Sequence, residues 1–454
     1  MNTRPPHWDM ARHLYTAEQY SGLMRGGNKL SLLLSYFYYP PLVYWLLALS
    51  FILLGHSIFV AVLVNSIWLL ILTVAFASIA KTVNRSRAAI FALIFFLTLP
   101  LVGSITKEVQ LDLPLSAMVA TNLALIIKTK NFSSYNWSLL YGIVFGLGML
   151  TKWTFIAFAA WPLLISIICI LKSQNRREKL KNLFLASLLI YGISAPWYLH
   201  NYYSLRIDFG ANATSAGVRE GDPAVSSLMG LSWYPRYILD YYLRLPWLLI
   251  CIASFYLVLS KKIKRVLSHD LLLILSTAVG GLIVFTFLRN KDIRYIMPIF
   301  VGVSLIAGIT IDILISKRQQ ILAYSLISLC VISYAITSFT TISQVSNVKL
   351  PMVPITVWSG AGYITGAPAR EEWCLAAAFE AIEEDGKALA FIGQDSIWFN
   401  DWAVKYYASK SNMTIVAVQD ADLILDRSND LPGDTIWSCR ALDGTQVSLR
   451  KNQP

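Results

Sequence analysis

The sequence predicts an α-helical protein that crosses a membrane many times and ends in a small α/β soluble domain. Of its 454 residues, 56% are hydrophobic and 14% are charged, whereas a soluble domain carries about 25% charged residues. Apolar runs such as 59–80, 271–288 and 295–315 are each long enough to cross a bilayer, which takes roughly 20 residues. The composition changes after residue 344, where strand-like and charged segments replace these runs.

The first part, residues 1–344, carries ten candidate spans. Their predicted limits are 57–80, 88–105, 113–128, 138–150, 153–171, 183–200, 237–259, 270–288, 295–315 and 320–340. Lysine and arginine clusters follow every second span, at 81–87, 128–130, 172–182, 261–265 and 317–318. Because basic loops favour the cytoplasmic side, we expect these clusters inside the cell and the remaining loops and the tail outside. The protein is therefore expected to be a multi-pass plasma (inner) membrane protein.

The apolar segment PLVYWLLALSFILL at 41–54 is treated differently. A crossing here would move every later basic cluster to the outside. Apolar stretches of about 10–14 residues more often form interfacial or re-entrant segments. We therefore expect a helix that lies at the outer membrane surface.

The tail, residues 345–454, is predicted to be an extracytoplasmic α/β domain. The segment 370–386 is typical of a helix ended by glycine, and 388–393, 414–419, 421–426, 435–442 and 445–451 are typical of short strands. Residues 345–368 are loop-like, with several prolines and glycines. Cys374 and Cys439 could pair with each other if the tail lies outside the cytoplasm.

The net charge of +12 does not indicate a nucleic-acid partner. Residues 345–454 hold 9 basic and 14 acidic side chains, which leaves 29 basic and 12 acidic ones in residues 1–344. The basic excess therefore belongs to the membrane part, where it orients the chain. We expect membrane lipids, and no nucleic acid, among the partners.

Charged residues on the predicted outer side are the candidate functional residues, because charge beside a membrane tends to mark function. They come from separate segments: Asp9, Lys107, Glu108, Asp112, Lys152, Lys291, Asp292 and Arg294. Cations bind a phosphate and offset its charge, while a carboxylate can take a proton from an attacking hydroxyl. The mixture suits a phosphate-bearing substrate and an activated hydroxyl.

Several segments, in order, resemble the GT-C superfamily of membrane glycosyltransferases, most closely the protein O-mannosyltransferases and the lipid A aminoarabinose transferase. They are PPHWDMARHLYTAEQY, YYPPLVYWLLALSFILLGHS, SITKEVQLDLPLSAMVATNLAL, GIVFGLGMLTKWTF, APWYLHNY and FLRNKDIRYIMPI, which together span about residues 5–300.

The resemblance implies inverting transfer of a sugar from a polyprenyl-phosphate carrier to a glycan, lipid or protein acceptor on the outer face. In this comparison Asp9 matches the catalytic carboxylate. Asp112 matches the aspartate of the second outer loop, and Lys107 the basic residue before it. Lys152 matches the lysine of a Leu-Thr-Lys motif, and Lys291 and Arg294 match a late basic pair.

The chain also departs from the family pattern. Family members have a spanning helix before the first outer loop, so we expect either a longer natural start or a copy without that helix. Met10 stands where a second acidic residue is frequent. Tyr38 and Tyr39 replace the Glu-Lys of the aminoarabinose transferase, which argues against that sugar.

Two other functions stay open at this stage, a transporter or flippase of lipid-linked substrates and an inactive family member that acts as a subunit. The cofactor is unknown, with a divalent metal ion left open. His7 and His13 lie near Asp9, but their spacing is not a recognised ligand pattern.

Overall fold

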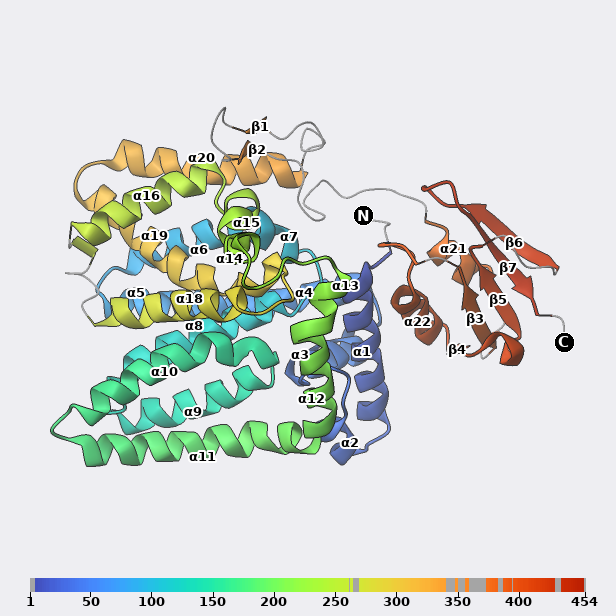
Figure 1. Ribbon diagram of the computed structural model, residues 1–454, viewed down its shortest axis with the longest axis horizontal. Helices are drawn as coiled ribbons and strands as arrows, with labels where there is room; N and C mark the ends of the chain where they lie inside the picture. Colours follow the sequence, from blue (N-terminus) through green and yellow to red (C-terminus); the bar gives the residue numbers. More distant parts are fainter. Residues whose placement is uncertain are drawn as a thin grey trace.

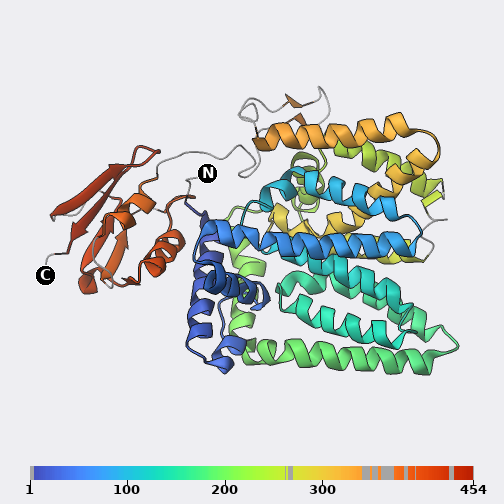
Figure 2. The ribbon, with the colours of Figure 1, turned by 180° about the vertical axis from the view of Figure 1, so that it is seen from behind.

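The computed structural model describes residues 5–260, 262–263, 269–339, 348–349, 356–358, 373–382, 387–393, 395–428 and 434–452. A bundle of long apolar helices occupies most of the described chain, and a small sheet domain stands beside one end of it (Figures 1 and 2). The long helices are α5 (Asn65–Thr82), α6 (Ser86–Thr98), α8 (Asp112–Thr129), α9 (Tyr135–Met149), α10 (Ile156–Leu171), α11 (Arg176–His200), α16 (Leu245–Leu259), α18 (Asp270–Thr286), α19 (Ile299–Ser316) and α20 (Gln320–Phe339). The predicted polytopic helical fold with a small C-terminal α/β domain is confirmed.

The centre of the bundle is formed by α8 and α19, which are buried along almost their whole length. A helix that is apolar on all sides is typical of the core of a large protein or of a membrane span. Four described helical segments are long and apolar enough to cross a membrane alone: Ile58–Thr82, Trp153–Leu171, Arg176–His200 and Ile299–Ser316. The first of these joins α4 (Ile58–Leu63) to α5.

Every predicted span corresponds to a helix or to a pair of helices, and two of them are broken. The segment 88–105 forms α6 and then α7 (Pro100–Ile105), because Pro100 has no amide hydrogen to continue the helix. The candidate span at 237–259 is not a single helix. The chain there forms α15 (Trp233–Tyr241) and α16, which meet at an angle of 118°.

Short helices gather at one end of the bundle, here called the α1 end. Helices α1 (Trp8–Arg25) and α12 (Tyr202–Gly210) run across the ends of the long helices (Figure 1). Helix α3 (Leu42–Leu54), the expected surface helix, packs against α1. The other short helices are α2 (Lys29–Leu34), η1 (Trp153–Phe155), η2 (Ala211–Ala216), α13 (Gly217–Arg219), α14 (Leu228–Leu231) and η3 (Ile293–Ile296).

The described basic connections lie at the other end of the bundle. The connections α5–α6, α8–α9, α10–α11 and α19–α20 all turn at the end opposite α1 (Figures 1 and 2). In the cluster at 261–265, residues 261, 264 and 265 lie outside the described residues. Within this end, Asp312 pairs with Arg85 at 2.5 Å and with Arg87 at 3.0 Å.

The C-terminal domain contains a five-stranded sheet in the order β4-β3-β5-β7-β6. Strands β3, β4 and β5 are parallel, while β7 is antiparallel to β5 and β6. The bounds are β3 (Ala388–Ile392), β4 (Thr414–Ile415), β5 (Leu423–Asp426), β6 (Thr435–Arg440) and β7 (Gln446–Lys451), with α21 (Leu375–Glu380), α22 (Asp401–Lys410) and η5 (Val418–Asp420). The five predicted strands are present, although β4 is short because η5 follows it.

Other details of the tail differ from the prediction. Within the helix predicted at 370–386, the structure has α21 at Leu375–Glu380, while residues 370–372 and 383–386 lie outside the described residues. Helix α22 was not predicted. Asn400 caps α22 by accepting the Ala403 amide, and this cap was a usable signal in the sequence. Part of the stretch predicted as loop forms a two-stranded ladder of β1 (Val348–Lys349) and β2 (Thr356–Trp358). The predicted domain boundary at 344/345 lies outside the described residues.

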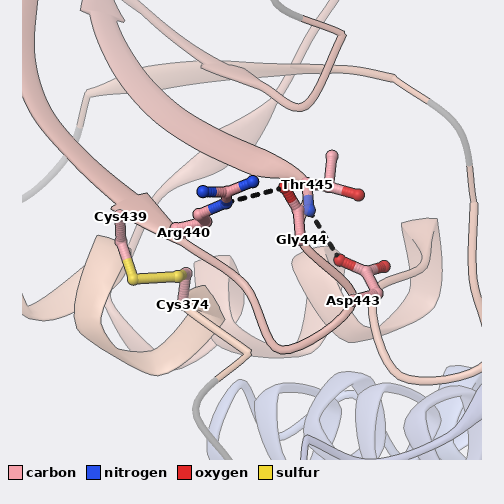
Figure 3. Close-up of a disulfide and its surroundings, with 6 residues drawn as sticks. All are labelled: Cys374, Cys439, Arg440, Asp443, Gly444 and Thr445. Carbon is pink, nitrogen blue, oxygen red and sulfur yellow. Dashed lines mark hydrogen bonds between the residues drawn. A yellow bond between two sulfur atoms is a disulfide. The ribbon is translucent and has the colours of Figure 1, made fainter.

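Cys374 and Cys439 form a disulfide that joins the start of α21 to β6 (Figure 3). Next to it, a turn links β6 to β7, in which the Thr445 amide donates to Asp443 Oδ1 at 3.0 Å and Arg440 Nε donates to the Gly444 carbonyl at 3.2 Å. The structure therefore contains the disulfide that was expected if the tail lies outside the cytoplasm.

The C-terminal domain packs on α1 through α22 (Figure 1). Ala11 of α1 belongs to the apolar core of that domain. The Arg12 guanidinium lies between two rings, 4.1 Å from the centroid of Tyr38 and 5.1 Å from that of Trp402. A cation–π contact attracts the cation to the ring face, so Trp402 and the packing of α22 tie the domain to the helix that carries Asp9.

Candidate functional site at the α1 end

The α1 end brings Asp9 and Arg294 together from distant parts of the chain. Asp9 lies in the first turn of α1, and Arg294 lies in η3, just before α19. The Arg294 guanidinium is 2.7 Å from Asp9 Oδ2, and the exposed fractions of the two side chains are 14% and 47%. Asp9 therefore has a face that is open to an incoming group.

Three further contacts hold Arg294 in place. Its Nε donates to both carboxylate oxygens of Asp292, at 2.9 and 3.1 Å, and Nη2 also donates to Asp292. Nη1 donates to Gln110 Oε1 at 3.1 Å. Bidentate pairing of this kind fixes a guanidinium geometrically. The orientation of Arg294 towards Asp9 is thus set by the protein.

The ion pair determines the protonation state of Asp9. Partial burial by itself raises the pKa of Asp9, but the Arg294 guanidinium lowers it well below its ordinary value, with smaller contributions from His13 and His7. Burial disfavours the charged form of Arg294, yet Asp292 and Asp9 raise its pKa well above the ordinary value. Both groups are therefore ionised at neutral pH.

A second ion pair joins Asp112, the first residue of α8, to Lys152, which precedes η1. Lys152 Nζ is 2.8 Å from Asp112 Oδ1, with only 5% and 3% of the two side chains exposed. The ammonium also lies 5.8 Å from the ring centroid of Tyr39 and 5.3 Å from that of Tyr295. This pair is enclosed by aromatic rings.

A pocket opens next to Lys152. Its walls are mostly aromatic and apolar, and Lys152 is its only charged lining residue in the described part of the chain. The lining residues are Tyr38, Tyr39, Lys152, Trp153, Thr154, Phe209, Phe285, Leu288, Asn290 and Tyr295. We call this the Lys152 pocket. Lys152 belongs to the second ion pair, and Tyr295, the residue after Arg294 in η3, lines the same pocket, so both ion pairs adjoin it.

Asn290 adds an unusual polar group to the Lys152 pocket. Asn290 is 7% exposed, and its side-chain oxygen Oδ1 has no hydrogen-bond partner among the described residues. A buried polar atom without a partner is costly.

Two predicted site residues lie elsewhere. Lys291 donates to the carbonyl oxygens of Phe285 and Thr286, at 3.0 and 2.6 Å, so it caps the last turn of α18. Lys107 lies over the ring of Tyr334 on α20, with 6.0 Å between Nζ and the centroid. Neither lysine lines the Lys152 pocket.

Glu108 is held inside the protein. His7 Nε2 lies 2.9 Å from Glu108 Oε2, and both residues are buried. Gln110, which binds Arg294, lies 3.4 Å from both of them. Gln110 was not predicted as a site residue because it carries no charge. Its position between Lys107 and Asp112 in the second outer loop was the available signal.

His13 lies one helical turn after Asp9, on the same face of α1. Its Nδ1 is 2.9 Å from the hydroxyl oxygen of Tyr44. Burial lowers the pKa of His13 to about 3, so the imidazole is neutral at physiological pH. The described residues contain no group of three or more His, Cys, Asp or Glu side chains that could hold a metal ion, and Asp9 and Asp112 each have a cation as partner.

A second pocket lies in the segment between α12 and α16. Its walls include the rings of Trp233 and Tyr237, whose centroids are 4.2 Å apart, and the carboxylates of Glu220, Asp222 and Asp240. Asp222 accepts the Lys291 amide at 2.7 Å. The segment 289–294 thus contributes Asn290 to the Lys152 pocket and contacts this second pocket through Lys291.

The chain is similar to known proteins in part of its sequence and in its fold. Residues 39–200 match the family described as dolichyl-phosphate-mannose-protein mannosyltransferase. The crystal structure of ArnT from Cupriavidus metallidurans in the apo state superposes with a TM-score of 0.67 at 15% identity, over 99% of this chain and 94% of that one. The resemblance to GT-C glycosyltransferases is confirmed.

Two further solved structures are similar. ArnT from the same organism bound to undecaprenyl phosphate gives a TM-score of 0.65 at 15% identity, with 99% and 94% of the two chains covered. The archaeal oligosaccharyltransferase AglB from Archaeoglobus fulgidus, in complex with an inhibitory peptide and a dolichol-phosphate, gives 0.47 at 9% identity, over 100% and 71%. No curated protein sequence matches the chain. The likeness to the ArnT structures establishes the fold.

Proposed function

We propose that the protein transfers a sugar from a polyprenyl-phosphate carrier to an acceptor hydroxyl at the α1 end, which faces the outside of the plasma membrane. One observation carries the proposal: a half-exposed carboxylate, Asp9, is paired with Arg294 beside an aromatic pocket that contains Lys152. The base and the cations that such a transfer requires are therefore in one place.

The donor would occupy the Lys152 pocket. Lys152 and Arg294 would neutralise the phosphate, and Phe209, Phe285 and Leu288 offer apolar contacts to the first isoprenoid units. The ArnT structure with bound undecaprenyl phosphate has the same fold, which supports a lipid phosphate as ligand. Asp112 would act on Lys152, whose ammonium it holds in place.

Asp9 would act as the base in a single inverting displacement. Asp9 takes the proton of the acceptor hydroxyl while the hydroxyl oxygen attacks the anomeric carbon. The bond from that carbon to the phosphate oxygen breaks, and the polyprenyl phosphate leaves with the electron pair. A phosphate that draws Arg294 away from Asp9 would also raise the pKa of Asp9, because the guanidinium is the group that lowers it. Donor binding would thus strengthen the base.

The acceptor would enter from the pocket between α12 and α16. Trp233 and Tyr237 offer flat apolar faces, and the neighbouring carboxylates accept hydrogen bonds from hydroxyl groups. The segment 289–294, which carries Arg294, lies between this pocket and the Lys152 pocket. This arrangement would bring the acceptor and the donor to Asp9 from two sides.

Orientation in the membrane follows from the ends of the bundle. The basic connections lie opposite α1, as expected for cytoplasmic loops, and the C-terminal domain beside α1 contains a disulfide, which is typical of oxidising compartments. Labelling of cysteines introduced at Arg177 and Ser411 should report opposite sides of the membrane. The same side for both would refute the orientation.

The activity can be tested with purified protein in lipid nanodiscs and a panel of undecaprenyl-phosphate-linked sugars. Release of undecaprenyl phosphate that depends on an added acceptor is expected for at least one donor. If donors bind but no sugar is released, and a lipid-linked sugar changes leaflet instead, the protein is a flippase. If the protein neither binds a donor nor transfers a sugar, the remaining interpretation is an inactive family member that acts as a subunit.

A further inference from the structure

Tyr38, one of the walls of the Lys152 pocket, has an unusual backbone conformation. Its φ is +78°, in the left-handed region that glycine adopts readily and a bulky residue rarely. Its ring packs edge-on against two other walls of the pocket, with centroid distances of 4.6 Å to Tyr39 and 5.1 Å to Trp153. A strained residue keeps such a conformation only where its surroundings hold it. Contacts of the Tyr38 side chain must therefore offset the strain of its backbone.

Arg12 on α1 supplies such a contact. Its guanidinium carbon lies 4.1 Å from the centroid of the Tyr38 ring, inside the range of about 6 Å in which a cation is attracted to a ring face. The Trp402 ring is farther away, at 5.1 Å, so Tyr38 is the nearer partner. The strain of one left-handed residue and the attraction of one cation to a ring are of similar size. The Arg12 contact is therefore large enough to decide the conformation of Tyr38.

The contact between Arg12 and Tyr38 connects α1 to the Lys152 pocket. Arg12 follows Asp9 by three residues and therefore lies on the same side of α1. Helix α1 is packed against α3 and against α22 of the C-terminal domain, so Arg12 projects from a firmly held helix. Without the guanidinium, the left-handed backbone of Tyr38 would lose the contact that offsets its strain. The ring would then leave its place beside Tyr39 and Trp153, and the wall of the pocket would open.

We propose that Arg12 is a positioning residue for donor binding, because its guanidinium holds the ring of Tyr38 in the wall of the Lys152 pocket. The inference rests on the proposed function, in which this pocket takes the polyprenyl phosphate. Arg12 does not line the pocket itself and acts on the donor through Tyr38. Loss of Trp402, the more distant ring, leaves Arg12 over Tyr38 and the affinity for the donor unchanged.

The test measures the dissociation constant of undecaprenyl phosphate for the full-length protein in nanodiscs. Arg12→Met keeps a long side chain but removes the charge, so the affinity should fall about fivefold, the effect of one cation–π contact. Arg12→Lys places an ammonium over the same ring and should bind within about twofold of the parent. Tyr38→Leu removes the ring and should bind about as weakly as Arg12→Met.

A double-mutant cycle separates action through Tyr38 from a general effect on the structure. If Arg12 acts through the ring, adding Arg12→Met to Tyr38→Leu should cause no further loss of affinity, because the contact is already absent. Lys128→Met is the matched control. The Lys128 ammonium lies 4.3 Å from the ring centroid of Trp137 at the other end of the bundle, and its removal should leave the affinity unchanged.

Several results would overturn the role of Arg12. They are the parent affinity in Arg12→Met or in Tyr38→Leu, a further loss when the two are combined, an Arg12→Lys protein that binds as weakly as Arg12→Met, and an equal loss in Lys128→Met. Failure of undecaprenyl phosphate to bind the parent would instead refute the donor assignment on which the inference rests.

Discussion

The two ion pairs at the α1 end contain the same kinds of charge but differ in their surroundings. Asp112 and Lys152 form a one-to-one pair that is almost fully buried. Asp9 shares Arg294 with Asp292 and has nearly half of its side chain exposed. A closed pair fixes a cation, whereas an open pair leaves a carboxylate free to react. From this difference we propose that Lys152 binds the phosphate and that Asp9 takes the proton, and the following predictions test these two roles.

The largest effect is expected for Asp9→Asn. The substitution keeps the shape of the side chain and removes its basicity, so sugar transfer should fall by about 10²–10⁴-fold, while undecaprenyl phosphate binding stays near the parent value. Transfer rate and lipid binding are measured on the same preparation. Glu18→Gln, further along α1, is the control and should transfer normally. Transfer by Asp9→Asn at the parent rate would exclude Asp9 as the base and leave Glu108 as the next candidate.

Asp112→Asn should reduce the stability of the protein much more than Asp9→Asn does. It leaves the Lys152 ammonium buried without a charged partner, which should lower the free energy of unfolding by about 3 kcal/mol. Asp9→Asn removes a half-exposed partner and should lower it by less than about 1 kcal/mol. Thermal unfolding of the two variants in the same detergent measures the difference. Equal loss of stability in the two variants would contradict the distinction between a buried pair and a half-exposed pair.

The pH dependence sharpens the role of Arg294. In the parent, Asp9 stays ionised below the ordinary pKa of about 3.9, so kcat/KM should not fall between pH 7 and about pH 5. In Arg294→Gln the charge that lowers the pKa is lost, while the partial burial that raises it remains. The carboxylate should then be protonated at a higher pH, and an acidic limb should appear in the profile. Profiles of the same shape in both proteins would contradict this electrostatic coupling.

The smallest effect is expected for Trp402→Ala in the C-terminal domain. The ring of Trp402 lies over Arg12, three residues after Asp9, and its removal should lower kcat about threefold, as expected from the loss of one cation–π contact, with little change in KM for the donor. Trp137→Ala, whose ring lies under Lys128, is the control. An unchanged kcat would show that the domain does not orient α1.

The sequence by itself determined the chemical character of the molecule. Apolar runs identified the helices of the bundle, because segments that cross a bilayer are mainly apolar, and one-sided basic clusters separated its two ends. Charged residues at span ends then identified Asp9, Asp112, Lys152 and Arg294 as candidates, since charge is rare beside these runs. Pro100 was also a local signal, but the prediction of one span at 88–105 did not use it.

Only the tertiary structure decided which of these charges meet. Lys291 matched the same motif as Arg294, yet it caps α18 because the helix ends one turn before it. The bend between α15 and α16 and the packing of α22 on α1 depend on contacts between distant segments, which no local pattern encodes. Asn290 carries no charge and gave no signal, and only the fold places it in the lining of the Lys152 pocket. Hydrophobic length and charge act locally along the chain, whereas pairing and burial depend on what the fold brings alongside.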